Sequence, residues 1–164
     1  MRPVLEGRGI QSAGIDMISD PDGLRLQLLG VPGGLAGTIV PGGRMSLDPP
    51  VMHPVGLDHV MLRVSDLEKS VAFYRTFFGN ERPRTKDKPP RVWFQIGNTR
   101  LGLEAAPAGS KPAVDHFCIT VAGFDRRAVE TAFTQLGVEL SPSSDEKLLR
   151  FRDPHGIVVE LKSA

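Results

Sequence analysis

The sequence predicts an α+β protein whose main body consists of two similar modules, each with a strand, a helix and then further strands. Two observations carry this prediction. The segments Leu57–Val64 and Val114–Val121 alternate apolar and polar residues in the same register around a shared Asp-His pair. A helical pattern and then a hairpin pattern follow each segment, so the order of elements repeats as well.

The two alternating segments are expected to be strands with one face against the core. Each strand presents a histidine, His59 or His116, on the face opposite its apolar residues. The apolar residues of the two strands are Val60, Leu62, Val64, Phe117, Ile119 and Val121.

A helix of about three turns is expected after each strand. In the first helix, Ser65 with Glu68 forms a capping box and Gly79 is the stop. In the second, Asp125 is the expected N-cap and Gly137 the stop. The core-facing residues are Leu67, Val71, Tyr74 and Phe78 in the first helix and Val129, Ala132, Phe133 and Leu136 in the second.

Each helix is followed by a predicted hairpin. The first reads RVWFQI, the turn GNTR and LGLE; the second reads KLLRFR, the turn DPHG and IVVEL. Gly-Asn and Asp-Pro-x-Gly are favourable turn sequences. One more strand per module is possible, near residues 82–86 and 138–141.

The phrase DPHGIVVEL at 153–161 has an earlier counterpart, DPDGLRLQL at 20–28, with Gln27 in place of Glu160. We interpret residues 1–29 as an orphan hairpin resembling the tail of a further module, docked on a sheet edge or another subunit. Gln27 would then serve packing; a chance hairpin is the alternative. A Gly/Pro-rich linker is expected at 30–54, and the main body at 55–164 divides into modules 55–110 and 111–164.

Composition excludes several classes of protein. A formal net charge of +1 gives no reason to expect nucleic acid or a membrane surface as partner. The single cysteine, Cys118, cannot form an internal disulfide and fits a reducing compartment. The N-terminal MRPVLEGRGIQ lacks the apolar stretch of a signal peptide, so a cytoplasmic location is expected.

Two histidines and two glutamates occupy matching places in the two modules and could converge inside a curved sheet. They are His59, Glu104, His116 and Glu160. Two imidazoles and two carboxylates suit a divalent ion such as zinc, nickel, manganese or iron(II). A structural origin is the alternative, because repetition creates such symmetry without a site. His53 and His155 are interpreted as solvated loop residues.

Over residues 55–164 the motifs DHVMLRVSDLEKSVAFYRTFFG, DHFCITV and RFRDPHGIVVEL resemble the vicinal oxygen chelate superfamily. This superfamily includes glyoxalase I, extradiol dioxygenases, fosfomycin-resistance proteins, methylmalonyl-CoA epimerase and bleomycin-binding proteins. The resemblance implies paired βαβββ modules forming an eight-stranded cup, with helices on its outer face, around a metal held by the four residues above. It implies a homodimer, with the cup closed within one chain or between two.

The resemblance is strongest to the glyoxalase type, an isomerase or lyase acting on a small anionic substrate chelated through adjacent oxygens, with Glu160 and Glu104 as catalytic carboxylates. Extradiol dioxygenases with Fe(II) and fosfomycin-resistance enzymes use two histidines and one glutamate, which His59, His116 and Glu160 supply. Both usually carry tyrosine where this chain has Arg150. A drug-sequestering cup is a further alternative, but such proteins generally lack the ligands.

Strand alternation also suggests substrate-binding residues. Arg63 and Arg150 would offer positive charge to an anion, unless they form ordinary ion pairs. Trp93 would form an aromatic wall. Cys118 faces the same side and is expected to be a small buried filler.

Overall fold

The structure is a computed structural model that describes residues 17–27, 51–143, 145 and 147–164. The chain divides into two compact units, Met1–Pro49 and Pro50–Ala164. The linker predicted at 30–54 lies outside the described residues as far as residue 50. Its last two residues belong to a strand, because β3 begins at His53.

The N-terminal hairpin is confirmed. Strands β1 (Met17–Ser19) and β2 (Arg25–Gln27) pair antiparallel, with Met17 opposite Gln27. In the turn, Asp20 Oδ1 accepts hydrogen bonds from the backbone N–H groups of Asp22 (2.9 Å) and Leu24 (2.8 Å).

The later copy of the phrase forms the same turn. Asp153 Oδ1 accepts hydrogen bonds from the backbone N–H groups of His155 (2.8 Å) and Ile157 (2.9 Å). Gly23 and Gly156 have φ angles of 82° and 85°, a region that glycine enters without strain. The two phrases therefore specify one local structure. Docking of the first hairpin on a sheet edge or another subunit stays a prediction.

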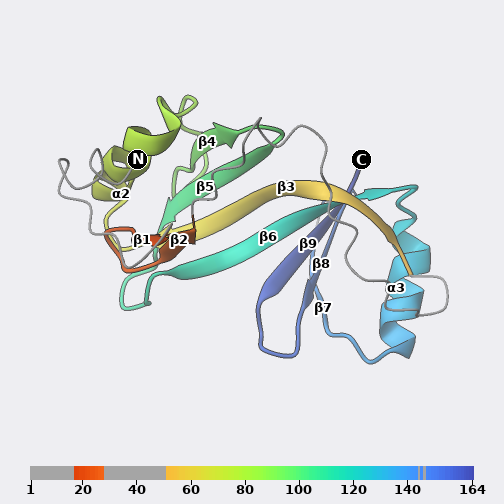
Figure 1. Ribbon diagram of the computed structural model, residues 1–164. Coiled ribbons are helices and arrows are strands. Elements are labelled where there is room, and N and C mark those ends of the chain that lie inside the picture. Colours follow the sequence, from red (N-terminus) through yellow and green to blue (C-terminus); the bar gives the residue numbers. More distant parts are fainter. Residues whose placement is uncertain (1–16, 28–50, 144, 146) are drawn as a thin grey trace. The chain divides into compact units, whose positions relative to one another are not determined.

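The second unit contains a seven-stranded sheet in the order β4-β5-β3-β6-β9-β8-β7 (Figure 1). The strands are β3 (His53–Val64), β4 (Val92–Ile96), β5 (Thr99–Ala105), β6 (Ala113–Ala122), β7 (Leu140–Ser141), β8 (Leu148–Arg152) and β9 (Val158–Ser163). The two long first strands, β3 and β6, pair antiparallel at the centre, and each pairs in parallel with the last strand of its module. Both modules thus join edge to edge within one chain.

Among the described residues, this sheet has seven strands, where the resemblance implied eight. Residues 82–86 are not a strand, although the N–H groups of Arg82 and Thr85 donate to the carbonyls of Trp93 (2.9 Å) and Arg91 (3.1 Å). Pro83 has no N–H to contribute, so a regular ladder does not form there. The strand considered at 138–141 is present as the short β7.

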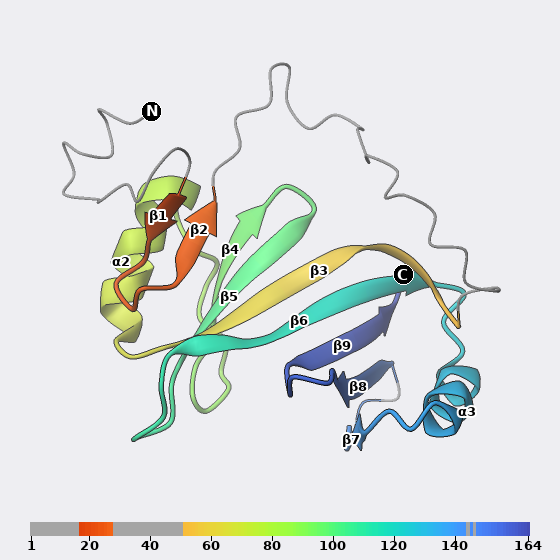
Figure 2. The same ribbon diagram turned by 60° about the horizontal axis from the view of Figure 1, so that its bottom comes forward.

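Helices α2 (Leu67–Phe78) and α3 (Arg126–Gln135) lie at opposite ends of the β3–β6 pair (Figure 2). Asp125 caps α3 as predicted, accepting from the N–H of Ala128 at 3.0 Å. The prediction of Ser65 as cap of α2 is wrong. Asp66 is the N-cap and accepts from the N–H of Lys69 at 3.0 Å, because its charge also complements the helix dipole.

Each helix covers apolar residues of its own module. Under α2, the Tyr74 ring stacks on Phe78 at 6.0 Å and lies 6.3 Å from Phe94. The buried cluster near α3 consists of Val121, Val129, Phe133, Leu149, Val159 and Leu161. None of the described helices is long and apolar enough to cross a membrane.

The change Phe94→Ala should lower the free energy of unfolding by about 3–5 kcal/mol, because the ring is fully buried against two aromatic neighbours. Urea unfolding followed by circular dichroism measures it. Leu136→Ala is the control: the prediction that Leu136 faces the core is wrong, because α3 ends at Gln135 and this side chain is 68% exposed. Its loss should cost no more than about 0.5 kcal/mol. Equal effects of the two changes would contradict this description of the core.

Candidate metal centre

Two β-bulges shape the centre of the sheet. Where β3 pairs with β6, the register skips Asp58 on β3 and Asp115 on β6, so each aspartate is an extra residue without a partner in the pairing. An extra residue in one strand interrupts the alternation of side chains. Each aspartate can therefore contact the histidine that follows it, His59 or His116, although a regular strand would point the two to opposite faces.

The first pair is Asp58 and His59. Asp58 Oδ1 lies 2.6 Å from His59 Nδ1 and also accepts from Arg100, while Lys162 Nζ donates to Oδ2 at 3.0 Å. Burial alone would raise the pKa of Asp58, but the hydrogen bonds from His59, Lys162 and Arg100 hold it well below its usual range. Asp58 is therefore an ionised acceptor at neutral pH.

The second pair repeats the first. Asp115 Oδ2 lies 2.7 Å from His116 Nδ1, and Arg63 Nη2 lies 2.8 Å from Oδ1. The hydrogen bond from His116 lowers the pKa of Asp115, against the effect of burial, and the charge of Arg63 lowers it further. Because an ionised carboxylate can only accept, both histidines carry a proton on Nδ1.

The two Nε2 atoms consequently face each other, and Glu160 faces both. His59 Nε2 lies 3.0 Å from His116 Nε2, and Glu160 Oε2 lies 3.5 Å and 3.6 Å from these nitrogens. All three residues are buried. Electron-pair donors that converge away from water repel unless positive charge lies among them, either a proton on one imidazole or a metal ion.

The three atoms fit a divalent ion. With these separations, one point can lie about 2.1 Å from all of them, the usual length of zinc–nitrogen and zinc–oxygen bonds. Two imidazoles and one carboxylate also suit iron(II), manganese or nickel. The carboxylates on both Nδ1 atoms supply the outer support that metal-binding histidines usually have.

Glu160 is 2% exposed and remains ionised. Burial alone would raise its pKa, but the contacts with His59, His116 and Arg150 lower it to about 2. Arg150 Nε donates to Oε1 at 2.6 Å. The other oxygen, Oε2, is the one directed at the histidines.

Glu104, the fourth ligand predicted from the sequence, is not brought to this point. Among the described residues, it belongs to no group whose possible ligand atoms lie within 4.8 Å of one another. Its Oε2 accepts from Arg91 Nε at 3.1 Å, and its Oε1 lies 3.7 Å from Arg63 Nε. Glu104 is thus held by arginines.

The strand register explains why. In the second module, Glu160 on β9 lies opposite Cys118 on β6, and Cys118 is two residues after His116. Two residues after the first histidine is Met61, which lies opposite Gly102 and not opposite Glu104. Gly102 is therefore the counterpart of Glu160.

At Gly102 there is no room for a side chain. An added Cβ would come within 2.5 Å of Met61 Cε and 2.7 Å of Trp93 Cζ3. The side chains of Met61 and Trp93 therefore fill the place of a fourth ligand. The three-donor set is asymmetric although the modules repeat.

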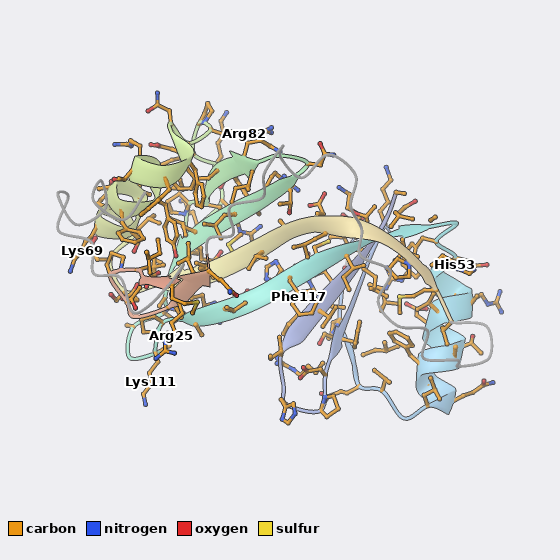
Figure 3. All side chains as sticks on the ribbon, in the orientation of Figure 1. Arg25, His53, Lys69, Arg82, Lys111 and Phe117 are labelled. Atoms are coloured by element: carbon orange, nitrogen blue, oxygen red, sulfur yellow. The ribbon has the colours of Figure 1, made fainter. Side chains whose placement is uncertain are left out.

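Two hollows adjoin the donors. A cavity of about 140 Å³ is lined by His59, Met61, Arg91, Trp93, Arg100, His116, Leu148, Arg150 and Glu160. A larger hollow, about 500 Å³, shares Arg91, His116 and Arg150 with it. It adds the cations Arg63, Lys111 and Arg152, and Figure 3 shows Lys111 projecting from the loop before β6. Positive side chains thus dominate the approach to the donors.

Substrate binding by Arg63, Trp93 and Arg150 stays a prediction, and their contacts refine it. Trp93 lines the smaller cavity, edge-on to the His59 ring at 5.2 Å and with Arg100 over its face at 4.8 Å. Arg63 and Arg150 line the larger hollow, but each is ion-paired to a carboxylate.

The other two histidines lie away from the donors. Both are exposed, as expected for solvated residues. His155 lies in the β8–β9 turn, whereas His53 is the first residue of β3 and lies beside α3 (Figure 3).

Four residues at this site were not assigned from the sequence: Asp58, Asp115, Arg91 and Arg100. The repeated Asp-His pair was a signal for the aspartates, but regular alternation would direct them away from the histidines. Nothing local marks the arginines.

The profile of the Glyoxalase/Bleomycin resistance protein/Dioxygenase superfamily matches residues 56–161, and the chain belongs to that superfamily. The resemblance found in the motifs is thereby confirmed.

The individual proteins that the chain resembles share only a modest part of its sequence. The chain is 26% identical over 116 residues to the metallothiol transferase FosB of Shouchella clausii, covering 65% of this chain and 78% of that protein. Methylmalonyl-CoA epimerase from Mycobacterium tuberculosis has a similar fold, with a TM-score of 0.54, 17% identity, and coverage of 73% of this chain and 93% of the epimerase. The 2,3-dioxygenase LapB from Pseudomonas sp. KL28 also has a similar fold, with a TM-score of 0.52 and 22% identity. The match covers 70% of this chain and 42% of LapB. The two solved structures support the fold alone.

Cys118 should react slowly with thiol reagents in the folded protein. Burial, followed by the charges of Glu160 and Asp58, raises the pKa of its thiol to about 12, so little thiolate exists near neutral pH. Labelling with iodoacetamide at pH 8 should be slow in buffer and fast in urea. Equally rapid labelling of the folded protein would contradict the burial of this side chain.

Proposed function

We propose that the protein is a divalent-metal-dependent enzyme that chelates a small anionic substrate through two adjacent oxygens. His59, His116 and Glu160 would hold the metal. The convergence of two imidazole lone pairs and one buried carboxylate is the observation that carries this proposal. A bound divalent ion would supply Lewis-acid polarisation of substrate oxygens.

The surrounding residues suit an anion. Arg91, Arg100 and Arg150 line the smaller cavity, where Glu160 is the only carboxylate among the described lining residues. In the larger hollow, five arginine and lysine side chains accompany the carboxylates Glu104 and Asp115. A negatively charged substrate would therefore be attracted and oriented.

The reaction we propose is thiol transfer. A thiolate attacks a substrate carbon, a C–S bond forms as a C–O bond breaks, and the departing oxygen takes up a proton. The similarity to the metallothiol transferase FosB supports this class, and the larger hollow has room for a second substrate. The glyoxalase type predicted from the sequence has less support, because Glu104 is engaged by Arg91 outside the donor group.

A second candidate is ring cleavage by an extradiol-type dioxygenase. Two histidines and one carboxylate are the donor set of many non-haem iron(II) oxygenases, and LapB shares the fold. Arg150 in place of the usual tyrosine argues against both candidates to a similar degree.

One panel of substrate assays distinguishes the candidate reactions. Protein reconstituted anaerobically with Mn²⁺, Zn²⁺, Ni²⁺ or Fe²⁺ is offered fosfomycin with a thiol, catechols with oxygen, and a hemithioacetal. We expect metal-dependent thiol consumption. Oxygen uptake with catechol under Fe²⁺ favours the dioxygenase, and hemithioacetal isomerisation favours the glyoxalase type. Absence of metal binding by the wild-type protein would leave a drug-sequestering cup as the better proposal.

All three proposed ligands come from one chain, because the two modules form one sheet. A cup closed between two chains is therefore not needed for the site. The predicted homodimer stays a prediction.

The variants Glu160→Gln and Glu104→Gln should differ sharply in metal affinity. Loss of Glu160 should weaken binding more than 100-fold, roughly the upper limit for changes outside the ligand shell, whereas Glu104→Gln should bind within about threefold of wild type. Isothermal titration with Mn²⁺ or Zn²⁺ measures both. A large loss in Glu104→Gln would instead support the four-ligand set predicted from the sequence.

Removing charge behind the histidines should weaken metal binding without abolishing it. Asp58→Asn and Asp115→Asn should each lower the affinity by about 10–100-fold, because each aspartate orients one imidazole and increases its basicity. Asp66→Asn, the same change at the cap of α2, is the control and should leave the affinity unchanged. Wild-type affinity in both site variants would show that the Asp–His pairs do not support a metal.

A further inference from the structure

We propose that Arg150 is a positioning residue that leaves Glu160 one oxygen with which to bind the metal. This inference rests on the proposed function, because it concerns how the carboxylate meets an ion. It assigns Arg150 a role different from the substrate binding predicted from the sequence.

The two oxygens of Glu160 have different surroundings. Both Nε and Nη2 of Arg150 contact Oε1, with the Nε contact at 2.6 Å. The two histidine Nε2 atoms approach Oε2, at 3.5 Å and 3.6 Å. The guanidinium therefore does not span the carboxylate with one nitrogen on each oxygen. It occupies one oxygen and leaves the other to the histidines.

The backbone fixes this arrangement. Arg150 on β8 lies directly opposite Glu160 on β9 in the antiparallel register, so the two side chains are cross-strand neighbours. The Arg150 side chain is 38% exposed and the Glu160 side chain 3%, so the arginine reaches the carboxylate from the open side of the site. A planar fork of donors can direct two N–H groups at one oxygen, which the compact ammonium of lysine does less well.

The consequence is an additional open position on the metal. Carboxylates bind ions through one oxygen or through both. With Oε1 held by Arg150, the protein supplies three donor atoms, and a six-coordinate ion keeps three positions. Two of these suit a substrate chelating through adjacent oxygens, and the third is free for water or a second reactant. A carboxylate bound through both oxygens would occupy that third position.

The experiment compares Co²⁺ coordination in wild-type protein, Arg150→Met and Arg150→Gln by X-ray absorption spectroscopy, with Co²⁺ binding measured by titration. Once the guanidinium is removed, both variants should gain about one Co–O contact, because Glu160 can then bind through both oxygens. The number of Co–O contacts in Arg150→Lys should lie between that of wild type and that of these two variants. Circular dichroism verifies folding, and the Gln variant keeps a polar side chain should the Met variant fold poorly.

Arg152→Met is the matched control. Arg152 lies on the same strand, two residues along, and its Nη1 donates to the carbonyl of Gly156 at 2.9 Å. This variant should retain the wild-type spectrum. If Arg150→Met and Arg150→Gln bind Co²⁺ with wild-type coordination, the positioning role proposed for Arg150 is wrong, but the proposed metal site is still supported. If wild-type protein binds no Co²⁺, Mn²⁺ or Zn²⁺, the proposed function and this inference are both overturned.

Discussion

The site depends on one constraint: two imidazole lone pairs and a buried carboxylate oxygen point at one another. The constraint arises because each histidine donates its Nδ1 proton to the aspartate before it, which leaves Nε2 as an acceptor. Burial of all three residues strengthens the mutual repulsion of these groups. The apolar packing beneath the helices holds the central strands in place against that repulsion, and positive charge at the meeting point relieves it.

The repeat supplies half of this arrangement, and departures from the repeat supply the rest. The paired Asp-His bulges on β3 and β6 bring one imidazole from each module. The last strands then differ: β9 contributes Glu160, while the corresponding position on β5 is Gly102, covered by Met61 and Trp93. The protein thereby presents a charged side and an apolar side to anything bound between them, which a symmetric four-ligand site would not.

The sequence predicted much of the fold and part of the candidate metal site. Alternation around Asp-His predicted the central strands and both histidines, and the DPxG turns predicted two hairpins with the same hydrogen bonds. Glu104 was paired with Glu160 by counting along the strands, but the GN and DPHG turns differ in length, and only backbone register shows a two-residue offset. The contacts of Asp58 with His59, and of Arg150 with Glu160, depend on a bulge and on cross-strand register, which a linear pattern does not encode.

The most direct test of the central claim is an anomalous-difference map from crystals of the protein grown with Mn²⁺ or Co²⁺. We predict one strong peak per chain within bonding distance of His59 Nε2, His116 Nε2 and Glu160 Oε2, with Glu104 still held by Arg91. A peak bonded to Glu104, or no peak between the histidines at a saturating metal concentration, would contradict the account.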